Sequence, residues 1–212
     1  MQQRRIFKKR KRAHGRRSLV CDVRDGLTVL LLAAGIALTC HATVAEARFI
    51  PSSSMAPTLD VGDRLVIEKI SYHLRTPRCG EIVVFHPPSS ALSRQVDADP
   101  NIPWIKRVVA LPGDHVALSH GRVFRNGKAL AEPYVTGVGA RLTITEREVP
   151  ANSVFVLGDN RAHSIDSATW GPLPVANIIG RASFCFWPPE RVGGLETPRF
   201  GLSVANRMTG LN

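Results

Sequence analysis

The sequence has few cysteines and no pattern typical of a metal site or a redox centre. Its four cysteines are Cys21, Cys40, Cys79 and Cys185, and neither a Cys-x-x-Cys pair nor a cluster of Cys and His occurs. No metal or other cofactor is therefore implied. A disulfide between Cys79 and Cys185 requires a close approach that sequence cannot supply, so we expect two free, buried thiols.

The chain after residue 50 lacks long stretches of helical periodicity, and it has no internal repeats. It contains instead short β-branched runs bounded by Gly, Pro, Asn and Asp, a pattern typical of strands. Asn126-Gly127 separates two such runs and tolerates the positive φ angles of a two-residue hairpin turn. These features predict a mainly β domain with an antiparallel sheet, and loops over 86–103 and 132–148. The expected strands cover 65–70, 81–85, 105–111, 122–125, 128–130, 153–157 and 178–187.

Excess positive charge is scarce outside the N-terminus. The net charge of +11 suggests a nucleic-acid-binding protein until the charges are located. Residues 1–25 carry ten Lys or Arg against two Asp and so hold +8 of that total, whereas the other 187 residues hold 18 basic and 15 acidic side chains. A basic tail on a nearly neutral domain favours membrane orientation over recognition of DNA or RNA, so we expect no specific nucleic-acid partner.

One apolar run follows the basic tail. Residues 27–44, LTVLLLAAGIALTCHATV, have no formally charged side chain, and as a helix they would span about 27 Å, close to the thickness of a bilayer core. Because no comparable basic block follows, the run predicts a single-pass helix with a cytoplasmic N-terminus and an extracytoplasmic C-terminal domain. The alternative is a cleavable secretory signal, since Ala45-Glu46-Ala47 is a small-x-small site at the end of the run.

Three blocks in series carry the candidate chemistry. The first is Pro51–Leu59 (PSSSMAPTL), the second is Trp104–Val109 (WIKRVV), and the third is Gly158–Arg161 (GDNR) followed by Ser164–Ser167 (SIDS). In this order they resemble the signature of bacterial type I signal peptidases, membrane-bound serine proteases that use a serine–lysine pair. The resemblance covers roughly residues 50 to 189. It implies a β-sheet protease fold and the cleavage of signal peptides from exported preproteins after small residues (Ala-x-Ala).

The resemblance also favours an uncleaved anchor at the apolar run. Cleavage after Ala47 would free such an enzyme from the membrane surface at which its substrates arrive. The expected organisation has four parts. They are a basic cytoplasmic tail (1–26), a transmembrane helix (27–45), an extracytoplasmic catalytic β domain (46–189) and a C-terminal tail (190–212).

Lys106 is the candidate general base. A serine hydroxyl is a poor nucleophile unless a nearby base takes its proton, and a lysine can serve only after losing its own proton. Burial among apolar groups favours that loss because it lowers the pKa of an ammonium group. In an extended strand Lys106, Val108 and Ala110 share a face, which would direct the amine toward a sheet core.

Three adjacent serines precede Met55, and composition cannot choose the nucleophile among them. The resemblance assigns it to Ser54, the residue immediately before the methionine. Ser52 then matches the residue whose hydroxyl forms an oxyanion hole with the backbone N–H of Ser54. Such donors stabilise the charge that develops on the scissile carbonyl oxygen. Ser53 occupies a variable position.

The third block supplies supporting residues by the same resemblance. Ser164 matches a serine that hydrogen-bonds the lysine amine and holds it toward the nucleophile. Asp159 is expected to pair with Arg107, next to the base, and Asp166 matches a second structural carboxylate.

One departure affects Asp166. The family commonly has Arg two positions later, where this chain has Ala168. Asp166 must therefore find another donor, and Arg161 and Arg181 are the candidates.

The resemblance further implies shallow pockets that admit small side chains, lined by Ile50, Leu59, Trp104 and Ile105. Larger side chains would clash in such pockets. The expected partners are signal peptides, membrane lipid and, transiently, the export machinery. Two alternatives stay open at this point: a specialised membrane peptidase with few substrates, and an inactive homologue that binds preproteins.

Overall fold

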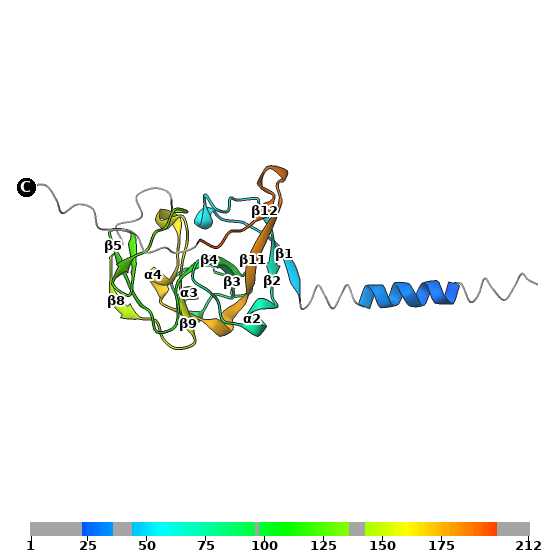
Figure 1. The fold of residues 1–212 in the computed structure, drawn as a ribbon, viewed down its shortest axis with the longest axis horizontal. Helices are drawn as coiled ribbons and strands as arrows, with labels where there is room; N and C mark the ends of the chain where they lie inside the picture. Colours follow the sequence, from blue (N-terminus) through cyan, green and yellow to red (C-terminus); the bar gives the residue numbers. More distant parts are fainter. Residues whose placement is uncertain (1–22, 36–43, 96–97, 136–142, 199–212) are drawn as a thin grey trace, which may run out of the picture. The chain divides into compact units, whose positions relative to one another are not determined.

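The computed structural model describes residues 23–35, 44–95, 98–135 and 143–198 (Figure 1). The chain divides into two compact units, residues 1–42 and 43–212. In the first unit, residues 23–35 form a helix. Within the described ranges no helix is both long enough and apolar enough to cross a bilayer. The expected transmembrane helix over 27–45 includes residues 36–43, which lie outside the described residues.

The second unit is built on two antiparallel sheets, as far as the described residues show, which confirms the prediction of a mainly β, antiparallel domain. The larger sheet has eight strands in the order β1-β2-β11-β3-β4-β9-β10, with β12 paired to β11, and the smaller has the order β7-β6-β5-β8. Figure 1 shows the long strand β11 beside β2 and β3. The strands are β1 (Ala45–Phe49), β2 (Arg64–Glu68), β3 (Ile82–Phe85), β4 (Trp104–Ala110), β5 (His115–Ser119), β6 (Arg122–Arg125), β7 (Lys128–Ala129), β8 (Ile144–Glu148), β9 (Ser153–Leu157), β10 (Leu173–Pro174), β11 (Ile178–Trp187) and β12 (Gly193–Gly194).

Short helical turns connect these strands. Each has three or four residues, so the sheets and not helices carry the packing of this unit. The turns are η1 (Ser53–Met55), α2 (Ser71–Leu74), α3 (Ser89–Leu92), η2 (Arg161–His163), α4 (Ser167–Trp170), η3 (Val175–Asn177) and η4 (Pro189–Arg191).

Five of the described strands lie where the sequence did not predict them: β1, β5, β8, β10 and β12. β8 falls in the segment expected to be a loop, and of its five residues only Ile144 is buried, so its sequence has no apolar alternation. Pairing with β5 nevertheless provides hydrogen-bond partners for the backbone N–H and C=O groups of β8. β12 lies in the expected C-terminal tail. β1 begins at Ala45, the last residue of the expected transmembrane helix, because Ala45–Phe49 pairs in register with β2.

The predicted hairpin turn is confirmed. Asn126 and Gly127 have φ angles of 53° and 73°, in the left-handed region that a two-residue turn between paired strands requires. Within the second unit Cys79 and Cys185 are both free thiols. Burial raises the pKa of the Cys79 thiol to about 12, so this group stays protonated at neutral pH.

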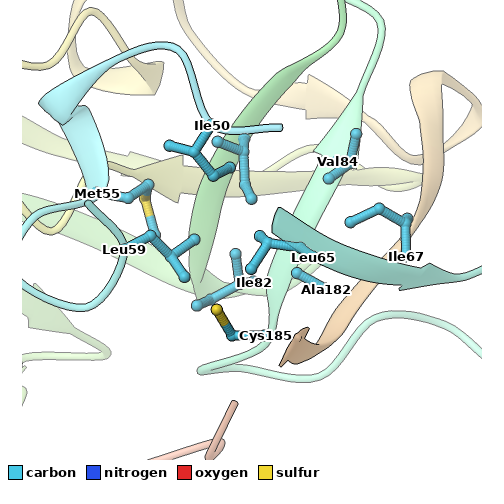
Figure 2. Close-up of a cluster of buried hydrophobic side chains, with 10 residues drawn as sticks. Ile50, Met55, Leu59, Leu65, Ile67, Ile82, Val84, Ala182 and Cys185 are labelled. Carbon is cyan, nitrogen blue, oxygen red and sulfur yellow. The ribbon is translucent and has the colours of Figure 1, made fainter. Parts of the chain in front are cut away.

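Among the described residues the buried side chains form three clusters, and one of them supports the first sequence block. Figure 2 shows Ile50, Met55 and Leu59, which flank the serines, gathered with side chains of the larger sheet. Met55 and Leu59 are fully buried and Ile50 is 2% exposed. This cluster holds the segment after β1 against the sheet. Its members are Ile50, Met55, Leu59, Leu65, Ile67, Ile82, Val84, Ile105, Ala182 and Cys185.

Candidate active site

The first block forms a tight turn that buries Ser54. Ser53–Met55 makes one turn of 3-10 helix, and the Leu59 N–H donates to the Met55 carbonyl at 2.9 Å. Because Ile50 before the serine and Met55 and Leu59 after it are anchored in the core, the turn is fixed on both sides of Ser54. Ser54 is 7% exposed, whereas its neighbours Ser52 and Ser53 are exposed. The environment therefore distinguishes the three serines that composition could not.

Lys106 approaches Ser54 from the middle of β4, the strand between β3 and β9. Its side chain is 5% exposed, and its Nζ lies 2.8 Å from Ser54 Oγ and 3.0 Å from the Ile105 carbonyl oxygen. Burial lowers the pKa of the amine from 10.5 to about 8, against the opposing charges of Asp166 and Asp159. With a pKa of about 8, a fraction of the Lys106 amine is neutral at physiological pH, and this neutral form can accept the serine hydroxyl proton across the contact.

Ser52 lies beside the nucleophile candidate. Its Oγ is 3.3 Å from Ser54 Oγ, and either hydroxyl can be the donor. Ser52 is exposed, with an extended backbone just before the turn. Its hydroxyl is therefore free to turn toward a bound carbonyl oxygen.

Two residues of the third block hold the Ser54 turn in ways that sequence analysis missed. The Asn160 backbone N–H donates to the Ser54 carbonyl, and its side-chain amide donates to the Ser53 carbonyl, both at 3.1 Å. Gly158 packs so closely that an added Cβ would lie 2.5 Å from the Ser54 carbonyl oxygen and 2.3 Å from Ser164 Oγ. Both residues belong to the GDNR motif of the third block, and this position in the motif was the sequence signal that could have identified them.

The expected hydrogen bond from Ser164 to the lysine amine is not formed. Lys106 Nζ is satisfied by Ser54 and the Ile105 carbonyl. Ser164 Oγ is buried against the backbone of Gly158 and has no hydrogen-bond partner within the described part of the chain. Ser164 thus lies next to the site, but its contact with Gly158 replaces the predicted contact with the base.

The expected pair of Arg107 and Asp159 is formed, and it is deeply buried. Arg107 Nε and Nη2 donate to the two Asp159 carboxylate oxygens at 2.8 and 2.6 Å, and both side chains are about 1% exposed. A third bond runs from Arg107 Nη1 to the Gly80 carbonyl at 2.8 Å. The Tyr134 ring covers the guanidinium at 4.1 Å, a contact that sequence analysis missed. This network ties β4, directly beside Lys106, to the third block.

Asp166 is satisfied by backbone donors, so the expectation of an arginine partner is wrong. Its carboxylate accepts from the Gly158 N–H at 3.0 Å and from the Ala168 N–H at 3.1 Å, the latter as the N-cap of α4. The two candidate arginines are engaged elsewhere: Arg161 hydrogen-bonds Glu132, and Arg181 forms an ion pair with Glu68. The turn from Gly158 to α4 wraps around the carboxylate and supplies its donors without a guanidinium.

A groove of about 340 Å³ opens at the pair of Ser54 and Lys106. Of the four residues expected to line substrate pockets, Trp104 and Ile105 line it. Ile50 and Leu59 are instead packed in the core cluster that supports the serine turn. The lining residues are Pro51, Ser52, Ser54, Gln95, Ile102, Pro103, Trp104, Ile105, Lys106, His163 and Ile165.

Metal-ligating side chains do not gather anywhere in the described ranges, where no group of three or more His, Cys, Asp or Glu could hold a metal ion. The ionisable groups described at the site are the amine of Lys106, the buried pair of Arg107 and Asp159, the Asp166 carboxylate and the imidazole of His163, which lines the groove.

Comparison with known proteins supports the family resemblance that the three sequence blocks carry. Residues 23–187 match the family described as signal peptidase, peptidase S26. The chain is 49% identical to a signal peptidase I of Leptolyngbya laminosa, over 82% of this chain and 84% of that protein. It is 46% identical to a probable signal peptidase I-1 of Synechocystis sp., over 84% and 89%. A crystal structure of a signal peptidase I from Enterococcus faecalis aligns with a TM-score of 0.40 at 25% identity, over 51% of this chain and 98% of that one.

Proposed function

The chain belongs to the signal peptidase family, peptidase S26, and on that premise we propose that it is a serine endopeptidase that removes N-terminal signal peptides from exported preproteins. The observation that carries this proposal is the buried 2.8 Å contact between Lys106 Nζ and Ser54 Oγ at the groove. Serine–lysine catalysis requires this arrangement, in which the serine hydroxyl lies within hydrogen-bond reach of a lysine amine that is buried away from water.

Ser54 is the nucleophile and Lys106 is the general base. Neutral Lys106 takes the Ser54 hydroxyl proton as Oγ attacks the carbonyl carbon of the residue before the cleaved bond. The same amine, now protonated, gives that proton to the departing amino group, and an acyl-enzyme remains. Lys106 then activates a water molecule that hydrolyses the ester and restores Ser54.

The developing oxyanion has two donors within reach of the serine turn: the Ser52 hydroxyl and the Ser54 backbone N–H. The 3.3 Å separation of the two serine oxygens supports this assignment, since an attacked carbonyl lies beside both. Asn160 and Gly158 contribute by holding the Ser54 carbonyl on the opposite side of the turn. The Arg107–Asp159 pair fixes the strand that carries the base.

Specificity for small residues, as in Ala-x-Ala, follows from the walls of the groove. Trp104 and Ile105 line it next to the dyad, and Ile105 is itself packed in the core cluster with Ile50 and Leu59. A larger substrate side chain would have to displace well-packed atoms, which costs free energy and favours Ala or Gly.

The enzyme acts at a membrane with its N-terminus in the cytoplasm and its catalytic domain outside. Support comes from the uncharged run over 27–44 and from the basic residues that precede it. Ser54 follows the end of that run by ten residues, so the site is held near lipid, where a signal peptide's apolar helix is still in the bilayer. Signal peptides and lipid are its partners, and contact with the export machinery is transient.

Cleavage of a radiolabelled preprotein by purified protein in detergent or lipid tests the proposal. Wild type, Ser54→Ala and Lys106→Ala would be compared, and mass spectrometry would identify the product N-terminus. Cleavage after Ala-x-Ala by wild type alone is expected. A folded wild type that cleaves only one preprotein of a broad panel would indicate a specialised peptidase, and one that binds preproteins without cleaving any would indicate an inactive homologue.

A further inference from the structure

His163 is an ionisable residue of the groove that the proposed mechanism leaves unused. Its imidazole lines the groove together with Ser54 and Lys106, and it is exposed to solvent. It ends η2, the turn that packs against η1, which carries Ser54. Of the described residues that line the groove, Lys106 and His163 are the two that can carry a positive charge, and none is Asp or Glu. The groove is therefore suited to an acidic side chain of a substrate.

The side chain of Asn160 fixes which ring nitrogen of His163 is available. Its amide nitrogen donates to the Ser53 carbonyl at 3.1 Å, and its amide oxygen lies 3.2 Å from His163 Nδ1. A carboxamide oxygen can only accept a hydrogen bond, so Nδ1 must carry the hydrogen of this contact. Nε2 is then the ring nitrogen that is left for a substrate.

Protonation of the ring changes what Nε2 does and leaves the contact at Nδ1 unchanged. In the neutral ring Nε2 has a lone pair and accepts a hydrogen bond, whereas in the charged ring it donates one. Histidine is the side chain that can change its charge between about pH 5 and 8. Nδ1–H donates to Asn160 in both forms, so the support of the Ser54 turn persists while the groove gains or loses a charge.

The other charged groups near His163 are already engaged. Arg161, on the same turn, hydrogen-bonds Glu132, and the carboxylate of Asp166 accepts from backbone N–H groups. The turn η1 has no ionisable side chain. Lys106 is neutral in the form that attacks a substrate, as the proposed mechanism requires. A charged substrate side chain at this part of the groove therefore meets the charge of His163.

The position of the small residues indicates which substrate side chains can reach His163. In an extended Ala-x-Ala segment the two alanines turn to one side, and the residue x and the first residue after the cut bond turn to the other. Trp104 and Ile105, which line the groove next to the dyad, belong to β4, whereas His163 belongs to η2. The ring is thus carried by a separate segment from the wall assigned to the small residues.

We propose that His163 is a specificity-determining residue that recognises the charge of the substrate on the side opposite its small residues. With a charged ring it favours Asp or Glu at x or directly after the cut bond, and it disfavours Lys or Arg there. With a neutral ring this preference is lost. The inference rests on the proposed function and adds a selection by charge to the selection by size.

The test compares preproteins that differ at one position. One set has Glu, Gln or Lys as x in the Ala-x-Ala segment, and a second set has the same residues directly after the cut bond. The kcat/KM of each is measured with full-length wild type in one detergent, at pH 6 and at pH 8.5. Because every substrate is cut by the same neutral form of Lys106, the fraction of that form cancels from the ratio of two kcat/KM values.

The ratio of kcat/KM for the Glu substrate to that for the Lys substrate should be about four- to tenfold higher at pH 6 than at pH 8.5 in at least one set. Attraction to Glu and repulsion from Lys at an exposed site each contribute about two- to threefold. The Gln substrate separates the two contributions.

His163→Asn is the matched variant, because its amide nitrogen can replace Nδ1–H as the donor to Asn160 and it has no ionisable group. Its ratio should be the same at both pH values, while its kcat on the Gln substrate stays within about threefold of wild type. His163→Gln decides the comparison if His163→Asn fails to fold. His73→Asn changes an exposed histidine of α2, outside the groove, and should keep the wild-type dependence on pH.

The inference is overturned if wild type cuts all of these preproteins and the ratio is the same at both pH values in both sets. It is also overturned if the His163 variants keep the wild-type dependence, because another group then supplies the charge. An enzyme that cleaves none of the preproteins removes the proposed function, and this inference with it.

Discussion

Replacing Lys106 with Met should abolish cleavage and make the protein more stable at neutral pH. Burial lowers the pKa of the amine from 10.5 to about 8, which corresponds to about 3 kcal/mol of unfolding free energy. The sign follows from proton binding. Below pH 8 both the folded and the unfolded chain hold the proton, so the cost of the buried ammonium is present in full. It disappears as the pH rises through 10.5, where the unfolded chain also loses the proton.

Met has a similar length and no charge, so it removes this cost. It also removes the Nζ contacts with Ser54 Oγ and the Ile105 carbonyl, each worth about 1 kcal/mol. The net gain at pH 7 should be about 1–3 kcal/mol, or roughly 3–10 °C in Tm for a chain of this size. The gain should shrink toward pH 10.

Urea unfolding followed by tryptophan fluorescence, at pH 7 and pH 10, measures the difference in full-length protein in one detergent. Lys128→Met, which changes an exposed lysine of β7, is the control and should change stability little. The kcat/KM of wild type should rise with pH as Lys106 loses its proton, since about 1% of the amine is neutral at pH 6 and about half at pH 8. A Lys106→Met protein that is less stable at pH 7, or a gap that is the same at pH 10, would refute the reasoning.

Three other changes separate the parts of the site. Gly158→Ala should lower kcat in the preprotein assay by more than about a hundredfold, because the added Cβ would lie 2.3 Å from Ser164 Oγ and 2.5 Å from the Ser54 carbonyl oxygen. Near-normal turnover would contradict the packing. Asp159→Ala leaves the Arg107 guanidinium buried without its carboxylate and should destabilise the fold by about 3–5 kcal/mol in urea; a loss below 1 kcal/mol would show that water reaches the arginine. Ser52→Ala should lower kcat about 10²–10³-fold with little change in KM, and an equal loss in Ser52→Thr would argue against a hydroxyl donor.

Most of the large sheet could be predicted from the sequence because its strands are short β-branched runs between turn residues. β8 could not, since its residues are mainly charged and only its pairing with β5 makes it a strand. β1 (AEARF) does alternate apolar and charged residues, but it directly follows the apolar run, and only its pairing with β2 shows that it belongs to the sheet. A short strand that forms because it pairs with a neighbouring strand cannot be identified from its own residues alone.

The sequence by itself indicated the candidate residues: a serine before Met55, chosen by the resemblance to a known signature, and a lysine among apolar residues. It also supplied Arg107 and Asp159 as opposite charges, whose pairing was expected from the same resemblance. Tertiary structure alone decided how those groups are held, because contacts between residues fifty or a hundred positions apart depend on how the strands align. Asn160 holds the Ser54 turn, and Asp166 is satisfied by backbone N–H groups and not by an arginine. Which apolar neighbours face the groove and which enter the core was decided in the same way, since burial is a property of the assembled sheet and not of any one residue.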